Sequence, residues 1–125
     1  MSLAPDPGEG TPGDIVRSLV RKIPPGRAAT YGTVGRVATA LGRPIGGART
    51  VAWILASLRG DDQTPWYRVV GAGGILLLKD RRGALQMRRL KDEGVRFVQG
   101  VIARPCLIDD VELLSTRRRR LRSGT

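Results

Sequence analysis

Apolar residues recur at helical spacing in two neighbouring stretches of the chain, residues 34–41 and residues 51–58. The apolar positions are Val34, Val37, Ala38 and Leu41 in the first stretch, and Val51, Ile54, Leu55 and Leu58 in the second. Both sets follow the i, i+3, i+4, i+7 pattern of one buried helix face. Only residues 42–47, which include three glycines, separate them. Two short amphipathic helices across a tight turn predict a helix-turn-helix.

A further helix is predicted before this pair, over residues 14–23, where Ile15, Leu19 and Ile23 share one face. Either Asp14 or Thr11 can cap its start. The Pro-Pro-Gly sequence at residues 24–26 ends it, and residues 28–30 are extended enough for a short strand. The three prolines and three glycines of residues 1–13 predict a flexible lead-in.

After the pair and a polar loop at residues 59–65, two apolar runs predict a small β-hairpin, or wing. Residues 68–70 and 75–78 bracket the glycine-rich residues 71–74. A helix follows over residues 82–93 and ends at Gly94. Its partial inner face is predicted to consist of Leu85, Met87 or Arg88, and Leu90.

These elements predict one domain that is mainly α with a small β component. We place this winged helix-turn-helix at residues 14–98, with residues 95–98 returning as a short strand. Beyond Gln99 the periodicity is lost, apart from a helical turn at residues 111–114, so residues 99–125 are assigned to an extension with a basic, disordered tail. A length of 125 residues, 41% of them hydrophobic, suits one core of this size.

The charge of the chain favours a polyanionic partner. There are 22 Lys and Arg residues against 11 Asp and Glu, a net charge of +11. The arginine-rich end does not account for this, because residues 1–98 alone carry 16 basic and 8 acidic side chains. Nucleic acid is the simplest partner for a basic folded body, and solubility alone is the alternative. The basic run at residues 117–122 either adds salt-sensitive DNA affinity or is simply disordered.

The chain has no His and a single Cys, and this excludes several kinds of site. No Cys/His zinc site, Ser-His-Asp triad or Cys-His pair can be built, so we expect no metal and no cofactor. One thiol cannot form an internal disulfide, so we expect a cytoplasmic protein, associated with the nucleoid if bacterial. No membrane partner is expected, because no apolar run approaches the roughly 20 residues of a spanning helix and no secretory signal pattern is visible.

Residues 65–70, Pro-Trp-Tyr-Arg-Val-Val, resemble the active-site motif of the O6-alkylguanine-DNA alkyltransferases. That motif reads Pro-Cys-His-Arg-Val followed by Val or Ile, where the cysteine thiolate accepts the alkyl group and the histidine helps to deprotonate it. Three other segments resemble the same family in order: residues 23–32 (Ile-Pro-Pro-Gly-Arg-Ala-Ala-Thr-Tyr-Gly), residues 46–51 (Gly-Gly-Ala-Arg-Thr-Val) and residues 92–95 (Asp-Glu-Gly-Val). The resemblance implies the fold of the alkyltransferase C-terminal domain.

The motif departs from the enzymes at its two reactive positions. Trp66 stands in the cysteine position, and an indole cannot accept an alkyl group at neutral pH as a thiolate can. Tyr67 stands in the histidine position, where His or Gln is usual, and a phenol with a pKa near 10 is a poor general base. Pro-Trp is the mark of the alkyltransferase-like proteins. These non-enzymatic relatives bind O6-alkylguanine in DNA, block its repair by alkyltransferases, and pass it to nucleotide excision repair.

The resemblance also implies roles for individual residues. Arg49 would enter the minor groove and fill the gap left by an extruded nucleotide, and Tyr31 would rotate that nucleotide by crowding its 3′ phosphate. Trp66 would line the base pocket, Arg68 would hold the motif loop, and Lys79 would reach the modified guanine. The expected sets are Trp66, Tyr31, Pro65, Tyr67, Val69 and Lys79 for the lesion pocket; Arg49, Tyr31, Thr30, Gly47, Ala48, Thr50 and Trp53 for DNA contact; and Arg68 and Glu93 for the structure of the motif.

Each assignment has a plainer alternative. Arg49 could touch phosphate only, Tyr31 could pack over the Pro-Pro-Gly turn, Trp66 could be a core residue, and Lys79 could be an ordinary surface lysine. The expected partners are duplex DNA carrying O6-alkylguanine and nucleotide excision repair proteins, bound by a monomer. A transcription regulator that binds undamaged DNA and a residual alkyltransferase are the competing functions. Cys106 is not expected to accept alkyl groups, because it lies outside the matched segments.

Overall fold

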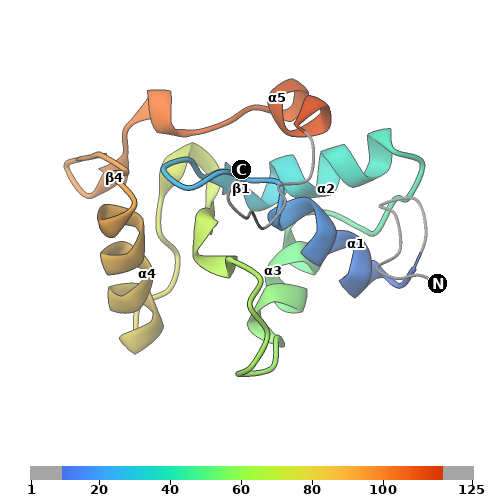
Figure 1. Ribbon diagram of the computed structural model, residues 1–125, viewed down its shortest axis with the longest axis horizontal. Coiled ribbons are helices and arrows are strands. Elements are labelled where there is room, and N and C mark those ends of the chain that lie inside the picture. The colour runs from blue at the N-terminus through green and yellow to red at the C-terminus, as the bar shows by residue number, and fades with distance from the viewer. Residues whose placement is uncertain (1–9, 117–125) are drawn as a thin grey trace, which may run out of the picture.

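The computed structural model describes residues 10–116, which form mostly helices with two small sheets (Figure 1). The helices are α1 (Pro12–Val20), α2 (Tyr31–Ala40), α3 (Ala48–Ala56), α4 (Arg81–Asp92) and α5 (Asp110–Ser115), with short 3₁₀ helices at Trp66–Arg68, Ala72–Gly74 and Arg104–Cys106. The strands are β1 (Ala29–Thr30), β2 (Val69–Val70), β3 (Phe97–Val98) and β4 (Val101–Ile102). The predicted fold class, mainly α with a small β component, is confirmed.

The helix pair predicted from the apolar pattern is α2 and α3. α2 begins directly after Thr30, whose side chain caps the helix by accepting a hydrogen bond from the backbone N–H of Thr33. α2 packs against α1, α3 and α5, and the apolar faces of these helices meet in one core cluster. All eight predicted apolar positions belong to this cluster or pack against it.

The first helix lies slightly earlier than predicted. It begins at Pro12, and Thr11 rather than Asp14 is the N-cap, while Asp14 completes a reciprocal capping box from the third helical position. The helix ends at Val20, but the following turn still buries Ile23 completely. The predicted lead-in therefore ends at Thr11, and its residues 1–9 lie outside the described part of the chain.

The predicted hairpin at residues 68–78 is wrong. β2 pairs in parallel with β1, with Ala29 opposite Val69 and Thr30 opposite Val70, and residues 75–78 form no strand. Val69 and Val70 are both fully buried, each in a different core cluster. A hairpin arm with one face in water would expose one of the two, so pairing with β1 is the more favourable arrangement.

α4 agrees with its predicted range within one residue, but its inner face was predicted wrongly. Gly83, Gln86 and Leu90 are buried, whereas Leu85 is exposed. Gln86 is a polar residue that the apolar pattern misses, and its amide donates hydrogen bonds to the carbonyls of Tyr67 and Val69 at 3.2 and 3.0 Å. The predicted stop at Gly94 is confirmed: its φ is +92°, and the N–H groups of Gly94 and Val95 bond back to Lys91 and Leu90.

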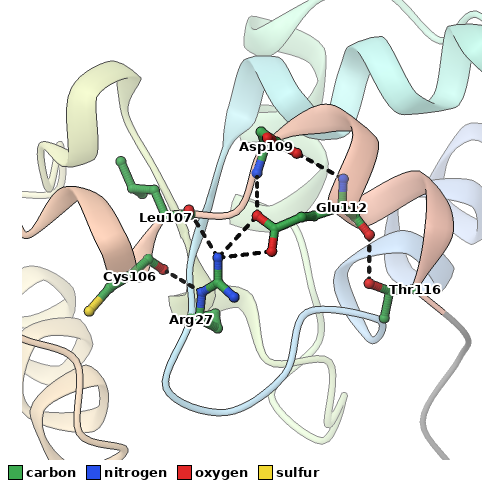
Figure 2. A network of polar contacts seen from close by, with 6 residues as sticks. All are labelled: Arg27, Cys106, Leu107, Asp109, Glu112 and Thr116. Atoms are coloured by element: carbon green, nitrogen blue, oxygen red, sulfur yellow. Dashed lines mark hydrogen bonds and ion pairs between the residues drawn. The ribbon is translucent and has the colours of Figure 1, made fainter.

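The predicted extension beyond residue 98 packs against the helices as far as Thr116 and contributes to the core. β3 and β4 form an antiparallel hairpin, and Ile108 and Leu113 are buried in the main core cluster. Figure 2 shows how Arg27 holds this segment: its guanidinium donates to the carbonyls of Cys106 and Leu107 and to the Glu112 carboxylate, at 3.1–3.3 Å. The predicted helical turn at residues 111–114 lies within α5, and the basic run at residues 117–122 lies outside the described residues.

Because Leu113 is fully buried and its neighbour Leu114 is 40% exposed, the two provide a matched test of this segment. Leu113→Ala is expected to lower the free energy of unfolding by about 2–5 kcal/mol, the cost of a cavity in a core. Leu114→Ala is expected to change it by about 0.5 kcal/mol or less. Urea denaturation of both variants measures the difference, and equal small effects would mean that α5 is not part of the folded core.

Candidate nucleic-acid interface

A cavity of about 520 Å³ opens between α3, the loop that follows it, Leu77 and Leu78 before α4, and Arg82 in the first turn of α4. In Figure 1, α3 and α4 stand on either side of the lower part of the molecule. The lining is mostly apolar: Ala52, Trp53, Leu55, Ala56, Leu58, Trp66, Leu77 and Leu78, with Tyr31, Arg49, Arg59, Gly60, Asp62 and Arg82 completing it. Gly83 lets Leu78 lie close against the first turn of α4, since a Cβ there would collide with the Leu78 carbonyl.

The cavity brings together Tyr31, Arg49 and Trp66, which are far apart in the sequence. Trp66 lies in the 3₁₀ helix after Pro65; it packs against the main core cluster and also lines the cavity. Tyr31 is the first residue of α2, and burial raises the pKa of its phenol, although the charge of Arg82 acts in the opposite direction. Both rings are half-buried, so neither is sealed inside the domain.

Other residues expected in the lesion pocket lie elsewhere. Tyr67 diverges from Trp66, the two rings being 5.9 Å apart at 86°, and its hydroxyl donates to Glu93 at 2.9 Å. Val69 is buried in the core, and neither Pro65 nor the exposed Lys79 lines the cavity. Of the residues expected in the lesion pocket, only Trp66 and Tyr31 line this cavity, and a role of the other four in lesion binding stays a prediction.

The side chains of Arg68 and Glu93 form the main polar contact beneath the motif. Arg68 donates to the Glu93 carboxylate through Nε at 3.0 Å and through a terminal nitrogen at 2.6 Å. Its other terminal nitrogen donates to the carbonyl of Ile23 at 2.9 Å, and Glu93 also accepts the N–H of Gly26 at 3.4 Å. The pair therefore ties the motif to the Pro-Pro-Gly turn and to the end of α4, as expected for a structural role.

The charges of this network are set by its geometry. Burial by itself would raise the pKa of the Glu93 carboxyl, but the hydrogen bonds from Arg68 and Tyr67 lower it below its ordinary value of 4.5. Burial, and then the hydrogen bond to Glu93, raise the pKa of the Tyr67 phenol. Tyr67 accordingly stays protonated at neutral pH and cannot serve as a base there.

The outward face of α3 carries most of the residues expected to contact DNA. Arg49 and Ala48 are exposed in its first turn, and Trp53 is exposed one turn later. Gly47 is the N-cap and supplies no side-chain hydrogen bond, so the start of the helix presents free backbone N–H groups to an anion. Two expected residues face other neighbours: Thr30 caps α2, and Thr50 lines a separate hollow.

Arg82 is a cavity residue that the sequence did not single out. It stands in the first turn of α4, after the N-cap Asp80, whereas Lys79 precedes that cap. With Arg49 and Arg59 it gives the cavity three arginines, while the one carboxylate in the lining, Asp62, lies 3.8–3.9 Å from Arg17 and Arg21. Arg82 is distinguished from the neighbouring basic residues only by its place in the cavity lining, which no local pattern shows.

The described residues contain no group of His, Cys, Asp and Glu side chains that could hold a metal ion. Cys106 is buried in the second core cluster, away from the cavity. Within residues 10–116, no helix has the length and apolar character needed to cross a membrane.

Comparison with known proteins matches this chain to a family model and to solved structures of DNA complexes. Residues 14–95 match the model of the family described as "6-O-methylguanine DNA methyltransferase, DNA binding domain". Two solved structures are similar: S. pombe Atl1 in complex with damaged DNA containing O6-carboxymethylguanine (31% identity, 70% of this chain and 80% of that one, TM-score 0.59), and S. pombe ATL in complex with DNA (26% identity, 84% and 94%, TM-score 0.60).

Two curated proteins are also similar. A "DNA base-flipping protein" of Vibrio parahaemolyticus is 35% identical over 78 residues, which cover 62% of this chain and 74% of that protein. A "Bifunctional methyltransferase/endonuclease" of Thermoplasma volcanium is 36% identical over 88 residues, which cover 69% of this chain. The match spans only 26% of the Thermoplasma protein.

The lowered pKa of Glu93 predicts a pH-dependent contribution to stability. Because the folded carboxyl titrates below its ordinary 4.5, its stabilisation is complete above that pH and is lost as the pH falls through the lowered value. At pH 7, Glu93→Gln is expected to lower the free energy of unfolding by about 3 kcal/mol, since it leaves the Arg68 charge unpaired. The deficit should shrink towards pH 3 in urea titrations. Asp61→Asn, at an 81% exposed carboxylate, is the control, and a pH-independent deficit in Glu93→Gln would contradict the assignment.

Proposed function

Since the chain belongs to the family of the 6-O-methylguanine DNA methyltransferase DNA-binding domain, we propose that it is a non-enzymatic DNA-damage sensor. It binds O6-alkylguanine in duplex DNA by flipping the nucleotide out of the stack, and it does not repair the lesion. The observation that carries this proposal is the cavity that Trp66 lines together with Tyr31 and Arg49. Its volume falls in the usual range for small-molecule sites.

Each of these three residues has a role in the proposed binding. The indole of Trp66 offers a flat apolar wall for the purine and its alkyl group, and Leu77 and Leu78 also line the cavity. Arg49, in the exposed first turn of α3, fills the gap that the extruded nucleotide leaves. Tyr31 rotates the nucleotide towards the cavity by crowding its phosphate. The cost of unstacking is a few kcal/mol and is smallest for a damaged base, which favours the lesion.

The absence of alkyl transfer follows from the groups around the cavity. Accepting an alkyl group requires a nucleophile, and the sequence places an indole at the position of the enzyme's cysteine. Tyr67, at the position of the enzyme's histidine, is directed to Glu93 and its raised pKa keeps it protonated. The output of binding is therefore a long-lived complex on the lesion, from which a monomer of this protein passes the damage to nucleotide excision repair.

The comparisons support this proposal. The similar S. pombe Atl1 is bound to damaged DNA containing O6-carboxymethylguanine, and the Vibrio relative is described as base-flipping. A transcription regulator would bind undamaged duplex equally well, so lesion preference separates the two functions.

The protein is expected to bind an O6-methylguanine duplex more tightly than the same duplex with guanine, measured by gel shift at fixed salt. Arg49→Ala should weaken binding to the lesion duplex by about tenfold or more, and affect the undamaged duplex much less, because only the flipped state contains a gap to fill. Arg104→Ala removes the same charge from an exposed site outside the cavity and serves as the control. Equal losses on both duplexes would reduce Arg49 to a phosphate contact.

Incubation with DNA that carries a radiolabelled O6-methyl group is expected to leave no label on the protein. Trp66→Ala should also retain no label while losing lesion affinity by about tenfold, because it removes the apolar wall without supplying a nucleophile. Denaturing electrophoresis detects the label, and a competent alkyltransferase on the same DNA controls for the substrate. Label retained by the wild-type protein would refute the non-enzymatic assignment.

A further inference from the structure

Trp53 is the most exposed aromatic residue in the described part of the chain. It leaves 70% of its surface accessible, whereas Tyr31, Trp66, Tyr67 and Phe97 are all partly buried. An indole is a large apolar group, and leaving it in water forgoes a substantial hydrophobic gain. Because this exposed indole lies at the cavity, it is a candidate contact for the partner that the cavity binds.

The position of Trp53 on α3 restricts what that partner can be. It lies four residues after Arg49 and so projects from the same side of the helix. The indole lines the large cavity and also a second hollow of about 440 Å³, which Ile45, Ile54 and Leu58 help to form. Ala52 and Ala56 leave the helix surface low beside it. The indole thus forms a ridge at the mouth of the cavity, next to the residue proposed to enter the DNA.

The charges around this ridge favour nucleic acid over an apolar protein surface. Arg49 and Arg59 line the cavity on one side of Trp53, whereas Arg17, in the second hollow, is already paired with Asp14 at 2.7 Å. A ridge that is apolar at its centre and cationic on the side of the cavity matches a DNA backbone, where apolar deoxyribose faces alternate with phosphates. It is also continuous with the DNA-binding face on which the proposed function rests.

We propose that Trp53 is a second wedge, which packs against the deoxyribose edge of the minor groove beside the gap that Arg49 fills. Four residues of helix advance about 6 Å, which corresponds to about two nucleotides at 3.4 Å each. Trp53 therefore supports the neighbouring steps of the strand that carries the lesion and prevents them from closing over the vacated position. This inference rests on the proposed flipping of the lesion and specifies how the opened duplex is held.

The test uses the full chain, a duplex with one O6-methylguanine, and the variants Trp53→Ala and Trp53→Phe. Trp53→Ala should weaken lesion binding about fivefold or more, chiefly through faster dissociation, and Trp53→Phe should retain most of the affinity. The salt dependence of binding should stay unchanged, because no phosphate contact is lost. A 2-aminopurine two nucleotides from the lesion should fluoresce less with Trp53→Ala than with the wild-type protein, since its neighbours restack.

Val111→Ala, at a residue that is 71% exposed on α5, controls for loss of a surface apolar group and should bind like the wild-type protein. Thermal unfolding checks that Trp53→Ala remains folded, as its exposure leads us to expect. Lesion binding by Trp53→Ala within about twofold of the wild-type value would overturn the inference, and so would an equal loss on undamaged duplex. Lesion preference in the wild-type protein distinguishes these results from failure of the proposed function, which would abolish that preference altogether.

Discussion

The ion pair between Arg68 and Glu93 is the contact on which the arrangement of the site depends. It joins three segments that the sequence keeps far apart: the motif at residues 65–70, the turn that ends at Gly26, and the end of α4. With the pair in place, the motif backbone is fixed from below, and Gln86 fixes it from the side through two carbonyls. The two consecutive aromatic side chains then lie on different sides of the motif: Tyr67 bonds to the polar network, and Trp66 lines the cavity.

This division between neighbouring residues explains how the motif keeps its shape with Trp66 and Tyr67 at the positions of the enzymes' cysteine and histidine. The hydroxyl of Tyr67 satisfies Glu93 without needing to carry a charge, and the guanidinium of Arg68 neutralises the carboxylate. The side chains of Tyr67, Arg68 and Glu93 therefore bond to one another, and none of the three lines the cavity. Replacing the reactive side chain by an indole changes the cavity wall alone, because the supporting contacts are made by other residues.

The elements of the fold that repeat a pattern locally could be predicted from the sequence, and those decided by distant contacts could not. α2, α3 and α4 have clear apolar periods or stop signals, such as Gly94. The parallel pairing of Val69 with Ala29 joins segments forty residues apart, so no local pattern reveals it. The same holds for Gln86, which looks like a surface residue until its two carbonyl partners are known. At the cavity, resemblance to a known motif indicated Tyr31, Arg49 and Trp66, but the choice of Arg82 over Lys79 depends on which residues of the folded chain line the cavity, a tertiary feature that no local pattern shows.

The proposed absence of alkyl transfer changes what the contacts of the site achieve. In an enzyme, only interactions that strengthen in the transition state accelerate the reaction, and tight binding of the substrate brings no further gain. When no reaction follows, every contact with the extruded base contributes to the lifetime of the complex. The net charge of +11 draws the protein to any DNA and weakens with salt. The apolar walls around Trp66 and the exposed indole of Trp53 contribute little to that general attraction, because undamaged duplex keeps its bases stacked and its steps closed. Discrimination between damaged and undamaged DNA must therefore come from the apolar part of the interface and from Arg49, whose gap exists only in the flipped state, while the other basic residues set how quickly each site is sampled.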